Sequence, residues 1–369
     1  MKTWQDEYCA WFALNMIQGI GSSVYKNLLE KFGHPECVFE AGLPELVKVE
    51  GVRKEIAQRI VGREFISDPE EELRKVKKCN ARIITYLDPS YPQFLKEIHY
   101  APVLLYVKGK DIPINRTFMA IVGSRNPTHY GIKSAEKIAF GLASRGIGVV
   151  SGLARGIDSA AHRGCLRGKG FTIAVMGTGI DRIYPASNKQ LSEQVMENGA
   201  LISEFPTGSP PEPKNFPIRN RIISGVSRGV VVVEATKNSG SLITASFALD
   251  QGREVFAVPG SIDSFKSMGT HSLIKQGAKL IENADDILEE FEFGDKSAKC
   301  SDVLTVTNNL PPDMGISEKK VYEIIGDYPV HIDQIVRTGD MDAGEVLSIL
   351  MQMELKGIVK QLPGKMFVR

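Results

Sequence analysis

The feature that most constrains the fold is a regular alternation of short apolar segments and Gly-rich turns between residues 112 and about 290. The apolar segments are TFMAIVG (117–123), GVVSG (148–152), TIAVMG (172–177), ALISEF (200–205), GVVVVEA (229–235) and EVFAVPG (254–260), and an amphipathic run follows each turn. Strands that alternate with helices predict a Rossmann-like doubly wound α/β domain, with a mostly parallel sheet and helices on both faces. Ligands of such sheets bind at the carboxyl ends of the strands, so we expect function in the loops that follow them.

A helical segment precedes this region. Residues 1–62 contain short helical patterns, in which SSVYKNLLEKFG follows the turn Gly19-Ile20-Gly21 and RKEIAQRIVG follows Gly51-Val52. This layout is typical of a helix-hairpin-helix or SAM-like domain, whose turn amides can hold a backbone phosphate. Arg53 stands where the second copy needs a glycine, so only the first turn is a candidate. A packed bundle whose glycines cap helices explains the pattern equally well.

Three further segments complete the chain. Residues 63–111 hold a charged helix and two apolar strands, and we interpret them as a bridge to the domain at 112–290. Residues 291–309 lack a sustained apolar period and are interpreted as a linker. Three helical patterns and a final hairpin over residues 310–369 predict a winged helix.

The last helix of this winged helix, at about residues 343–355, has an unusual composition. It follows Asp340 and Asp342, contains Glu345 and Glu354, and has no basic residue. A helix that reads duplex DNA normally presents Arg, Lys, Asn or Gln to the bases. We therefore expect this helix to contact protein or to pack within its domain.

Composition limits the functions that this fold can serve. The 369 residues carry a net charge of +1, so nucleic-acid binding would require a local basic patch. The five cysteines lack C-x-x-C spacing and the six histidines lack ligand spacing, which argues against disulfides and against a metal site. The sequence shows no secretory signal, and its longest apolar run has the length of a strand, so we expect a cytoplasmic protein without a membrane span.

The loop after the first strand of the α/β domain argues against a dinucleotide cofactor. The G-x-G-x-x-G fingerprint would place its middle glycine where Arg125 stands. The segment GVVSGLARGID supplies Gly152 and Arg155 where a ribose-binding acid would lie. Arg125 would obstruct a pyrophosphate but could itself contact a phosphate through a charge-assisted pair. We expect no NAD or FAD.

The stretch NFPIRNRIISG (215–225) crowds an aromatic residue and two arginines at the mouth of a helix. Pro217 prevents the preceding segment from continuing as helix, which could leave Phe216 exposed as a platform for an unpaired base. Stacking of that kind stabilises any base sequence. Alternatively, Phe216 is a buried hydrophobic staple and the arginines are solvated.

Several strand-end loops add basic and small polar residues. Ser239, Gly240 and Ser241 can offer amide and hydroxyl donors at a helix N-terminus, which is a seat for an anion. Together the loops predict a phosphate-binding crest beside helix N-termini, with the basic residues Arg125, Arg155, Lys214, Arg219 and Arg221.

These motifs resemble the DNA-processing protein A family (DprA, also called Smf). The resemblance is carried by VGSRNPTHYG, SGLARGIDSAAHRG, GTGIDRIYP, ISEFPTG, NFPIRNRIISG, VVVVEATKNSGSLITASFALDQGREVFAVPG and GTHSLIKQGA, in this order, and by the lead-in YPQFLKEIHYAPVLLYVKG. It covers most of residues 90–290, and both flanking regions match the family's usual domains.

The resemblance implies a non-catalytic protein without cofactor that binds and protects single-stranded DNA and loads RecA onto it in natural transformation. It also implies a homodimer formed through the central domain. The DNA-binding residues that it implies are Ser124, Arg125, Gly152, Arg155, Gly156, Lys214, Asn215, Phe216, Arg219, Asn220, Arg221, Ser239, Gly240 and Ser241.

Two other functions remain open at this point. Nucleotide phosphoribohydrolases resemble the central domain, but their P-G-G-x-G-T-x-x-E loop is interrupted here, because eight residues separate Pro259-Gly260 from Gly269-Thr270 and no glutamate follows. Such an enzyme needs a carboxylate near the phosphate, and Asp158 and Glu234 are the candidates, although capping and strand-end roles explain both. A sensor of small nucleotides would use the same crest without chemistry. His162 and His271 do not suggest a metal.

Overall fold

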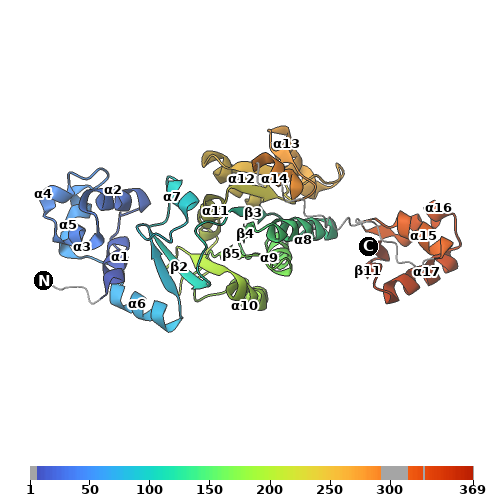
Figure 1. Cartoon of the computed structure of the whole chain (residues 1–369), viewed down its shortest axis with the longest axis horizontal. Coiled ribbons are helices and arrows are strands. Elements are labelled where there is room, and N and C mark those ends of the chain that lie inside the picture. Colours follow the sequence, from blue (N-terminus) through green and yellow to red (C-terminus); the bar gives the residue numbers. More distant parts are fainter. Residues whose placement is uncertain (1–5, 292–314, 327–328, 369) are drawn as a thin grey trace. The chain divides into compact units, whose positions relative to one another are not determined.

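The computed structural model describes residues 6–291, 315–326 and 329–368 (Figure 1). All but the first residue of the expected 291–309 linker lies outside these ranges. The chain divides into two compact units, one formed by Met1–Pro127 with Ser134–Ile287 and the other by Thr128–Lys133 with Leu288–Arg369. In the described part of the chain, no helix is both long and apolar enough to cross a membrane.

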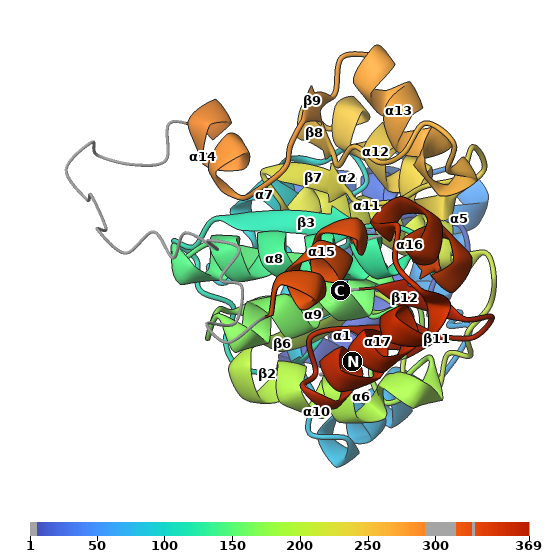
Figure 2. The ribbon, with the colours of Figure 1, turned by 90° about the vertical axis from the view of Figure 1, so that its right-hand side faces the viewer.

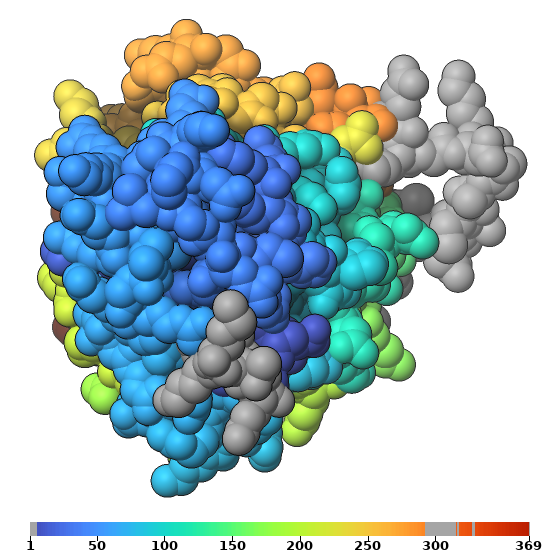
Figure 3. Space-filling view, turned by 90° about the vertical axis from the view of Figure 1, so that its left-hand side faces the viewer, coloured from blue at the N-terminus to red at the C-terminus, as the bar shows by residue number. Residues whose placement is uncertain are grey.

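The chain begins with a helical region (blue in Figures 1 and 3). Its helices are α1 (Glu7–Asn15), α2 (Ser22–Phe32), α3 (Pro35–Glu40), α4 (Leu43–Leu46) and α5 (Lys54–Gly62). The first glycine turn lies where the sequence predicts it, since α2 begins directly after Gly21 and Gly19 has a φ of 98°. Phosphate binding by this turn stays a prediction. The Phe12 ring stacks on Tyr106 of the central sheet at a centroid distance of 5.9 Å, so the two regions share a core.

The centre of the molecule is a nine-stranded sheet in the order β1-β2-β6-β5-β4-β3-β7-β8-β9. Its strands are β1 (Arg82–Thr85), β2 (Leu104–Gly109), β3 (Phe118–Val122), β4 (Gly148–Ser151), β5 (Thr172–Val175), β6 (Ala200–Ser203), β7 (Gly229–Val232), β8 (Glu254–Ala257) and β9 (Lys279–Leu280). The strands from β6 to β9 in this order pair in parallel, which confirms the mostly parallel sheet. The segment interpreted as a bridge contributes β1 and β2, and β2 pairs with β6 in antiparallel register.

Helices cover both faces of this sheet. They are α6 (Pro69–Lys78), α7 (Gln93–Glu97), α8 (His129–Ser144), α9 (Ile157–Arg167), α10 (Lys189–Asn198), α11 (Asn215–Val226), α12 (Gly240–Asp250), α13 (Met268–Lys275) and α14 (Asp285–Phe291). The helices α7, α11 and α12 share a core with one face, and α1 and α10 share a core with the other. In β5, Ile173 and Val175 enter the first core and Ala174 the second. Strands buried on both faces are apolar throughout, as the sequence shows.

The C-terminal region forms the predicted winged helix (red in Figure 2). It contains α15 (Ile316–Ile324), β10 (Val330–His331), α16 (Ile332–Gly339), α17 (Ala343–Leu355), β11 (Lys360–Leu362) and β12 (Met366–Val368). The three strands pair in the order β10-β12-β11. Ile335, Leu350 and Phe367 belong to its own apolar core, which holds the three helices against the small sheet.

Candidate nucleic-acid interface

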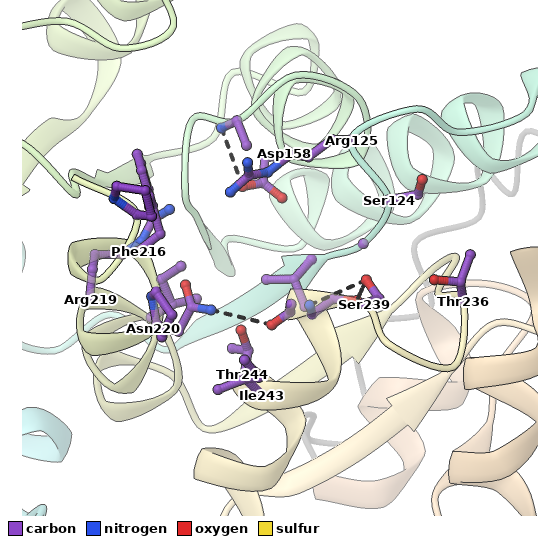
Figure 4. A pocket seen from close by; sticks show the side chains of 18 of the residues that line it. Ser124, Arg125, Asp158, Phe216, Arg219, Asn220, Thr236, Ser239, Ile243 and Thr244 are labelled. Carbon is purple, nitrogen blue, oxygen red and sulfur yellow. Dashed lines mark hydrogen bonds between the residues drawn. The ribbon is translucent and has the colours of Figure 1, made fainter. Parts of the chain in front are cut away.

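The strand order creates a crevice at the carboxyl ends of β3 and β7. The chain passes from β3 to β4 on one side, whereas β7 pairs with the other side of β3, so the loops after these strands diverge. This topological switch point is where open α/β sheets bind ligands. A cavity of about 450 Å³ lies here, lined by the loops after β3 and β7 and the N-terminal halves of α11 and α12 (Figure 4).

The loop after β3 presents Arg125 to this cavity. Arg125 is exposed, and its guanidinium carbon lies 5.4 Å from the centroid of the Phe216 ring. Within the described ranges, no carboxylate forms an ion pair with it. The neighbouring Ser124 accepts a hydrogen bond from the Asn126 amide through its hydroxyl oxygen at 3.1 Å, which holds the turn. The loop therefore offers a positioned cation that is not neutralised by a neighbouring acid.

Two predicted glycines in the segment after β4 allow close contacts, Gly156 with the loop after β3 and Gly152 with Arg219 of α11. Gly156 has a φ of 84°, and a Cβ there would lie 2.3 Å from the carbonyl oxygen of Ser124. A Cβ on Gly152 would lie 2.4 Å from a guanidinium nitrogen of Arg219. Only glycine fits at either position. These residues shape the site through the backbone and do not offer side chains to a ligand.

Phe216 stands at the mouth of α11, as the sequence predicts. The residue is half-buried, and its ring packs so close to Gly177 that a Cβ there would lie 2.7 Å from the ring. The Tyr184 ring lies beside it, with the centroids 5.5 Å apart and the planes tilted by 41°. Phe216 is therefore supported from below, yet keeps part of its surface accessible. Neither alternative considered for it, free platform or buried staple, describes it completely.

Tyr184 is a site residue that the sequence reasoning missed. It is 41% exposed and lines the main cavity together with Phe216. It also lines a second, small cavity of about 30 Å³, to which Arg155 and Arg125 contribute. The signal for it was the strand-end motif GTGIDRIYP, which contains Tyr184. The Phe216–Tyr184 pair thus borders two basic hollows.

Arg219 lines both cavities but does not lie on an exposed crest, and its contact with DNA stays a prediction. Only 3% of the residue is exposed, and its guanidinium donates to the carbonyl oxygens of Gly152, at 2.8 Å, and Val175. Burial lowers the Arg219 pKa to about 10, while the carboxylate of Asp158 opposes that shift. One turn after Phe216, the side chain points inward and fills the space beneath the cavity. Arg219 ties the ends of β4 and β5 together.

Arg221 does not lie on an exposed crest either. Its guanidinium pairs with Glu204, and only 12% of its side chain is exposed. Arg221 lies five positions after Phe216, so its side chain is rotated by about 140° around α11 relative to that of Phe216. Burial raises the pKa of Glu204 although Arg221 opposes the shift. This ion pair fastens α11 to the loop after β6 and is not a lining element of the cavity.

The remaining residues around α11 differ in their accessibility. Lys214 is exposed, and its ammonium lies 2.8 Å from the Glu212 carboxylate, a surface pair of small energetic value. Asn215 is buried, and its amide nitrogen lies 3.5 Å from the Pro210 carbonyl oxygen. Asn220 lines the cavity and donates to the Gly240 carbonyl oxygen at 3.3 Å, which links α11 to α12. Lys214 is the exposed cation of this group, and Asn220 is a polar residue held by a hydrogen bond.

The N-terminus of α12 faces the same cavity. Ser239 is its N-cap and accepts from the Ser241 amide at 3.4 Å, and the two hydroxyl oxygens lie 2.7 Å apart. Thr236 and Thr244, which the sequence reasoning missed, line the cavity beside them (Figure 4). The N-terminus of a helix attracts anions through its free amides and its dipole. The structure therefore brings Ser239, Gly240 and Ser241 to the same hollow as Arg125.

The carboxylates considered for catalysis are buried. Asp158 is 7% exposed and accepts from the amides of Gly152, at 3.1 Å, and Ala154, at 3.3 Å. Burial raises its pKa, and Arg219 and these amides oppose the shift. Glu234 is only 4% exposed. These hydrogen bonds show that Asp158 stabilises the loop after β4.

The two histidines considered for metal binding have other contacts. His162 is fully buried with Nδ1 2.8 Å from the Thr172 hydroxyl, and burial lowers its pKa to about 3. The Nε2 atom of His271 lies 3.1 Å from the Gly260 carbonyl oxygen. No group of three or more potential metal-binding side chains occurs within residues 6–291, 315–326 and 329–368.

These features define the class of the protein: a doubly wound α/β protein whose switch point combines a free cation, an aromatic pair and a helix N-terminus. Residues 82–292 match the family model of DNA recombination-mediator protein A, and residues 309–365 match the model of the DprA winged helix domain. The chain belongs to the DNA recombination-mediator protein A family.

Individual relatives agree with this assignment. Protein Smf of Synechocystis sp. is 36% identical to the chain over 398 residues, which cover 99% of both proteins. The crystal structure of DprA from Streptococcus pneumoniae has a TM-score of 0.70 and 38% identity, and the match covers 80% of this chain and 100% of that one. A structure of DNA processing protein A from Helicobacter pylori, described for its single-stranded DNA binding mode, has a TM-score of 0.51 and 28% identity over 58% of this chain and 97% of that one.

Proposed function

We propose that this protein binds single-stranded DNA at the crevice between β3 and β7 and does so without catalysis. The observation that supports this most strongly is the exposed guanidinium of Arg125 above the half-buried Phe216 ring. A cation beside an aromatic platform suits a phosphate that is linked to an unpaired base. The similar protein from Helicobacter pylori is described as binding single-stranded DNA.

The arrangement of donors supports a strand more than a single nucleotide. The N-terminus of α12 lines the larger cavity, Arg155 lines the smaller one, and Arg125 and the aromatic pair line both. Successive phosphates of one strand could occupy both hollows while a base stacks on the aromatic pair between them. We therefore propose that affinity grows with the number of linked phosphates and that duplex DNA, whose bases are paired, binds more weakly.

A titration of labelled oligo-dT and a matched duplex at two salt concentrations tests the proposal. We expect preferential and salt-sensitive binding of the single strand, and a loss of affinity of about 10- to 100-fold in Arg125→Ala, because a contact to a charged phosphate is removed. Arg167→Ala is the matched control, since Arg167 lies at the opposite end of α9 and borders only a separate shallow pocket. Equal affinity for the two DNA forms, or equal effects of both substitutions, would contradict the proposal.

The same preparation distinguishes the alternatives. A nucleotide sensor would be saturated by a mononucleotide as readily as by oligo-dT. A phosphoribohydrolase would release free base from a nucleoside monophosphate, and we expect no turnover, because a carboxylate braced by two backbone amides is poorly suited to move a proton. Release of base that is abolished by Asp158→Asn would establish the enzyme instead.

We further propose that the bound strand is protected and handed to RecA in natural transformation. This proposal rests on family membership, since a recombination mediator has to act on a recombinase filament. RecA ATPase activity on a strand already covered by single-strand-binding protein is the direct measurement. We expect the full chain to shorten its lag and Arg125→Ala to leave the lag unchanged. A full chain without effect would contradict RecA loading but not strand binding.

We also propose a homodimer formed through the edge of the sheet at β9. The segment from β8 to β9 exposes the large apolar side chains Ile262 (87%), Phe265 (64%), Met268 (40%) and Leu280 (45%). Exposed apolar surface at an open sheet edge favours association. Sedimentation velocity should show a dimer, and Phe265→Asp with Leu280→Asp should yield a monomer. A wild-type monomer at micromolar concentration would rule it out.

A further inference from the structure

One side of α17 is exposed and apolar, and the proposed DNA binding gives it no role. Among the described residues of the winged helix, the strongly exposed large apolar side chains are Leu347 (55%), Met351 (65%) and Leu355 (82%). They recur every four residues and therefore follow one line along the helix. The opposite side of α17 lies in the domain core and contains Val346, Ile349, Leu350 and Met353.

Small residues complete this exposed side. Gly344 and Ser348 are exposed and, at about 100° per residue, fall on the same side of α17 as Leu347 and Met351. Small side chains between large ones leave depressions into which the side chains of another helix can pack. We call the side formed by Gly344, Leu347, Ser348, Met351 and Leu355 the α17 face.

The charges around the α17 face select its ligand. Glu345 and Glu354 are exposed and lie toward its two edges, and Asp340 and Asp342 precede the helix and are also exposed. The helix itself contains no Lys or Arg. A negative border disfavours the phosphates of DNA and favours a partner with basic side chains.

We propose that the α17 face binds an amphipathic helix of a partner protein that carries basic residues on both edges of its apolar side. Its apolar residues, spaced as i, i+3, i+4 and i+7, pack against Leu347, Met351 and Leu355. Its lysines or arginines lie opposite Glu345 and Glu354 and set the orientation. This is the helix-in-groove mode of recognition, in which apolar anchors supply affinity and border charges supply specificity.

Two synthetic helical peptides test this proposal on the full chain. They have the same apolar side, but one is bordered by Lys and the other by Glu, and fluorescence anisotropy measures their binding. We expect the Lys-bordered peptide to bind at least tenfold more tightly, and Met351→Asp in the full chain to weaken it by at least tenfold. Ile114→Asp is the matched control, because Ile114 is 62% exposed and lies outside the winged helix.

Several results would overturn the proposed binding of a helix by the α17 face. Equal binding of both peptides, or equal effects of Met351→Asp and Ile114→Asp, would overturn the proposal. Displacement of the Lys-bordered peptide by duplex DNA would identify nucleic acid as the ligand and overturn it as well. A self-association of the full chain that Met351→Asp abolishes would assign the α17 face to a second copy. Unchanged circular dichroism of Met351→Asp shows that the variant is folded.

Discussion

The floor of the pocket and its rim use the same residue types for different purposes. The floor consists of Arg219, Asp158 and Gly152, which are buried and bonded to one another or to strand-end carbonyl groups. The rim contains Arg125 and Phe216, which keep accessible surface, and the exposed Lys214 lies two residues before Phe216 in the chain. A buried arginine whose guanidinium donates to carbonyl groups inside the protein stabilises the fold, whereas an exposed arginine without an ion-pair partner remains available to a phosphate. Burial, rather than residue type, separates the two roles.

The largest expected effect concerns the floor. Arg219→Met would leave the carboxylate of Asp158 buried without its cation and would remove the donor to Gly152 and Val175. Each of the two carbonyl oxygens left without this donor costs about 1–3 kcal/mol of unfolding free energy. Chemical denaturation measures it, and Arg125→Met at the rim should change the unfolding free energy by no more than about 0.5 kcal/mol. Similar losses in both variants would remove the distinction between floor and rim.

The aromatic pair should produce the next largest effect, and on binding rather than stability. Phe216→Ala removes a stacking surface worth about 1–3 kcal/mol per base. Tyr184→Ala should also weaken oligo-dT binding, since Tyr184 supports the Phe216 ring and lines the cavity. We expect a smaller loss than for Phe216→Ala. Titrations of the two single variants and of the double variant measure the coupling. Strictly additive losses would show that the two rings act independently.

The sequence predicts the backbone of this site better than its side-chain directions. Gly156 lies where the loops after β3 and β4 meet, and apolar strands with glycine turns are enough to predict that meeting. The four arginines of the crest are not distinguishable by type, and only the helical geometry of α11 turns Arg219 inward and Arg221 away. Phe216, Arg219 and Arg221 are close in sequence, but the helix places their side chains on three different sides.

Two other features could not be predicted from the sequence, because they also depend on tertiary structure. Tyr184 reaches Phe216 from a loop more than thirty residues earlier in the sequence, and no local pattern reports that approach. The strands β1 and β2 were interpreted as a bridge because pairing between β2 and β6 depends on tertiary structure. The winged helix, by contrast, is predicted well, since its helices follow local apolar periodicity.

A smaller effect is expected at the exposed Lys214. Lys214→Ala should weaken oligo-dT binding by less than about tenfold and reduce the salt slope by about one, because an exposed lysine adds one phosphate contact. Glu212→Gln should strengthen binding, since Glu212 pairs with Lys214 in the free protein. Titrations over a range of salt concentrations measure both slopes. An unchanged slope in Lys214→Ala would place this lysine outside the path of the strand.

The smallest expected effect extends the comparison from the pocket to the winged helix. A chain that ends after residue 304 keeps the whole pocket but lacks α17, whose exposed side carries acidic and apolar residues. We expect its affinity for oligo-dT to stay within about twofold of the full chain, because no cation of α17 is available to a phosphate. The Lys-bordered peptide should no longer bind to it. A many-fold loss of single-strand affinity would instead show that the winged helix contributes to the DNA site. The difference between the basic pocket and the acidic, apolar side of α17 would then no longer assign DNA to the one and protein to the other.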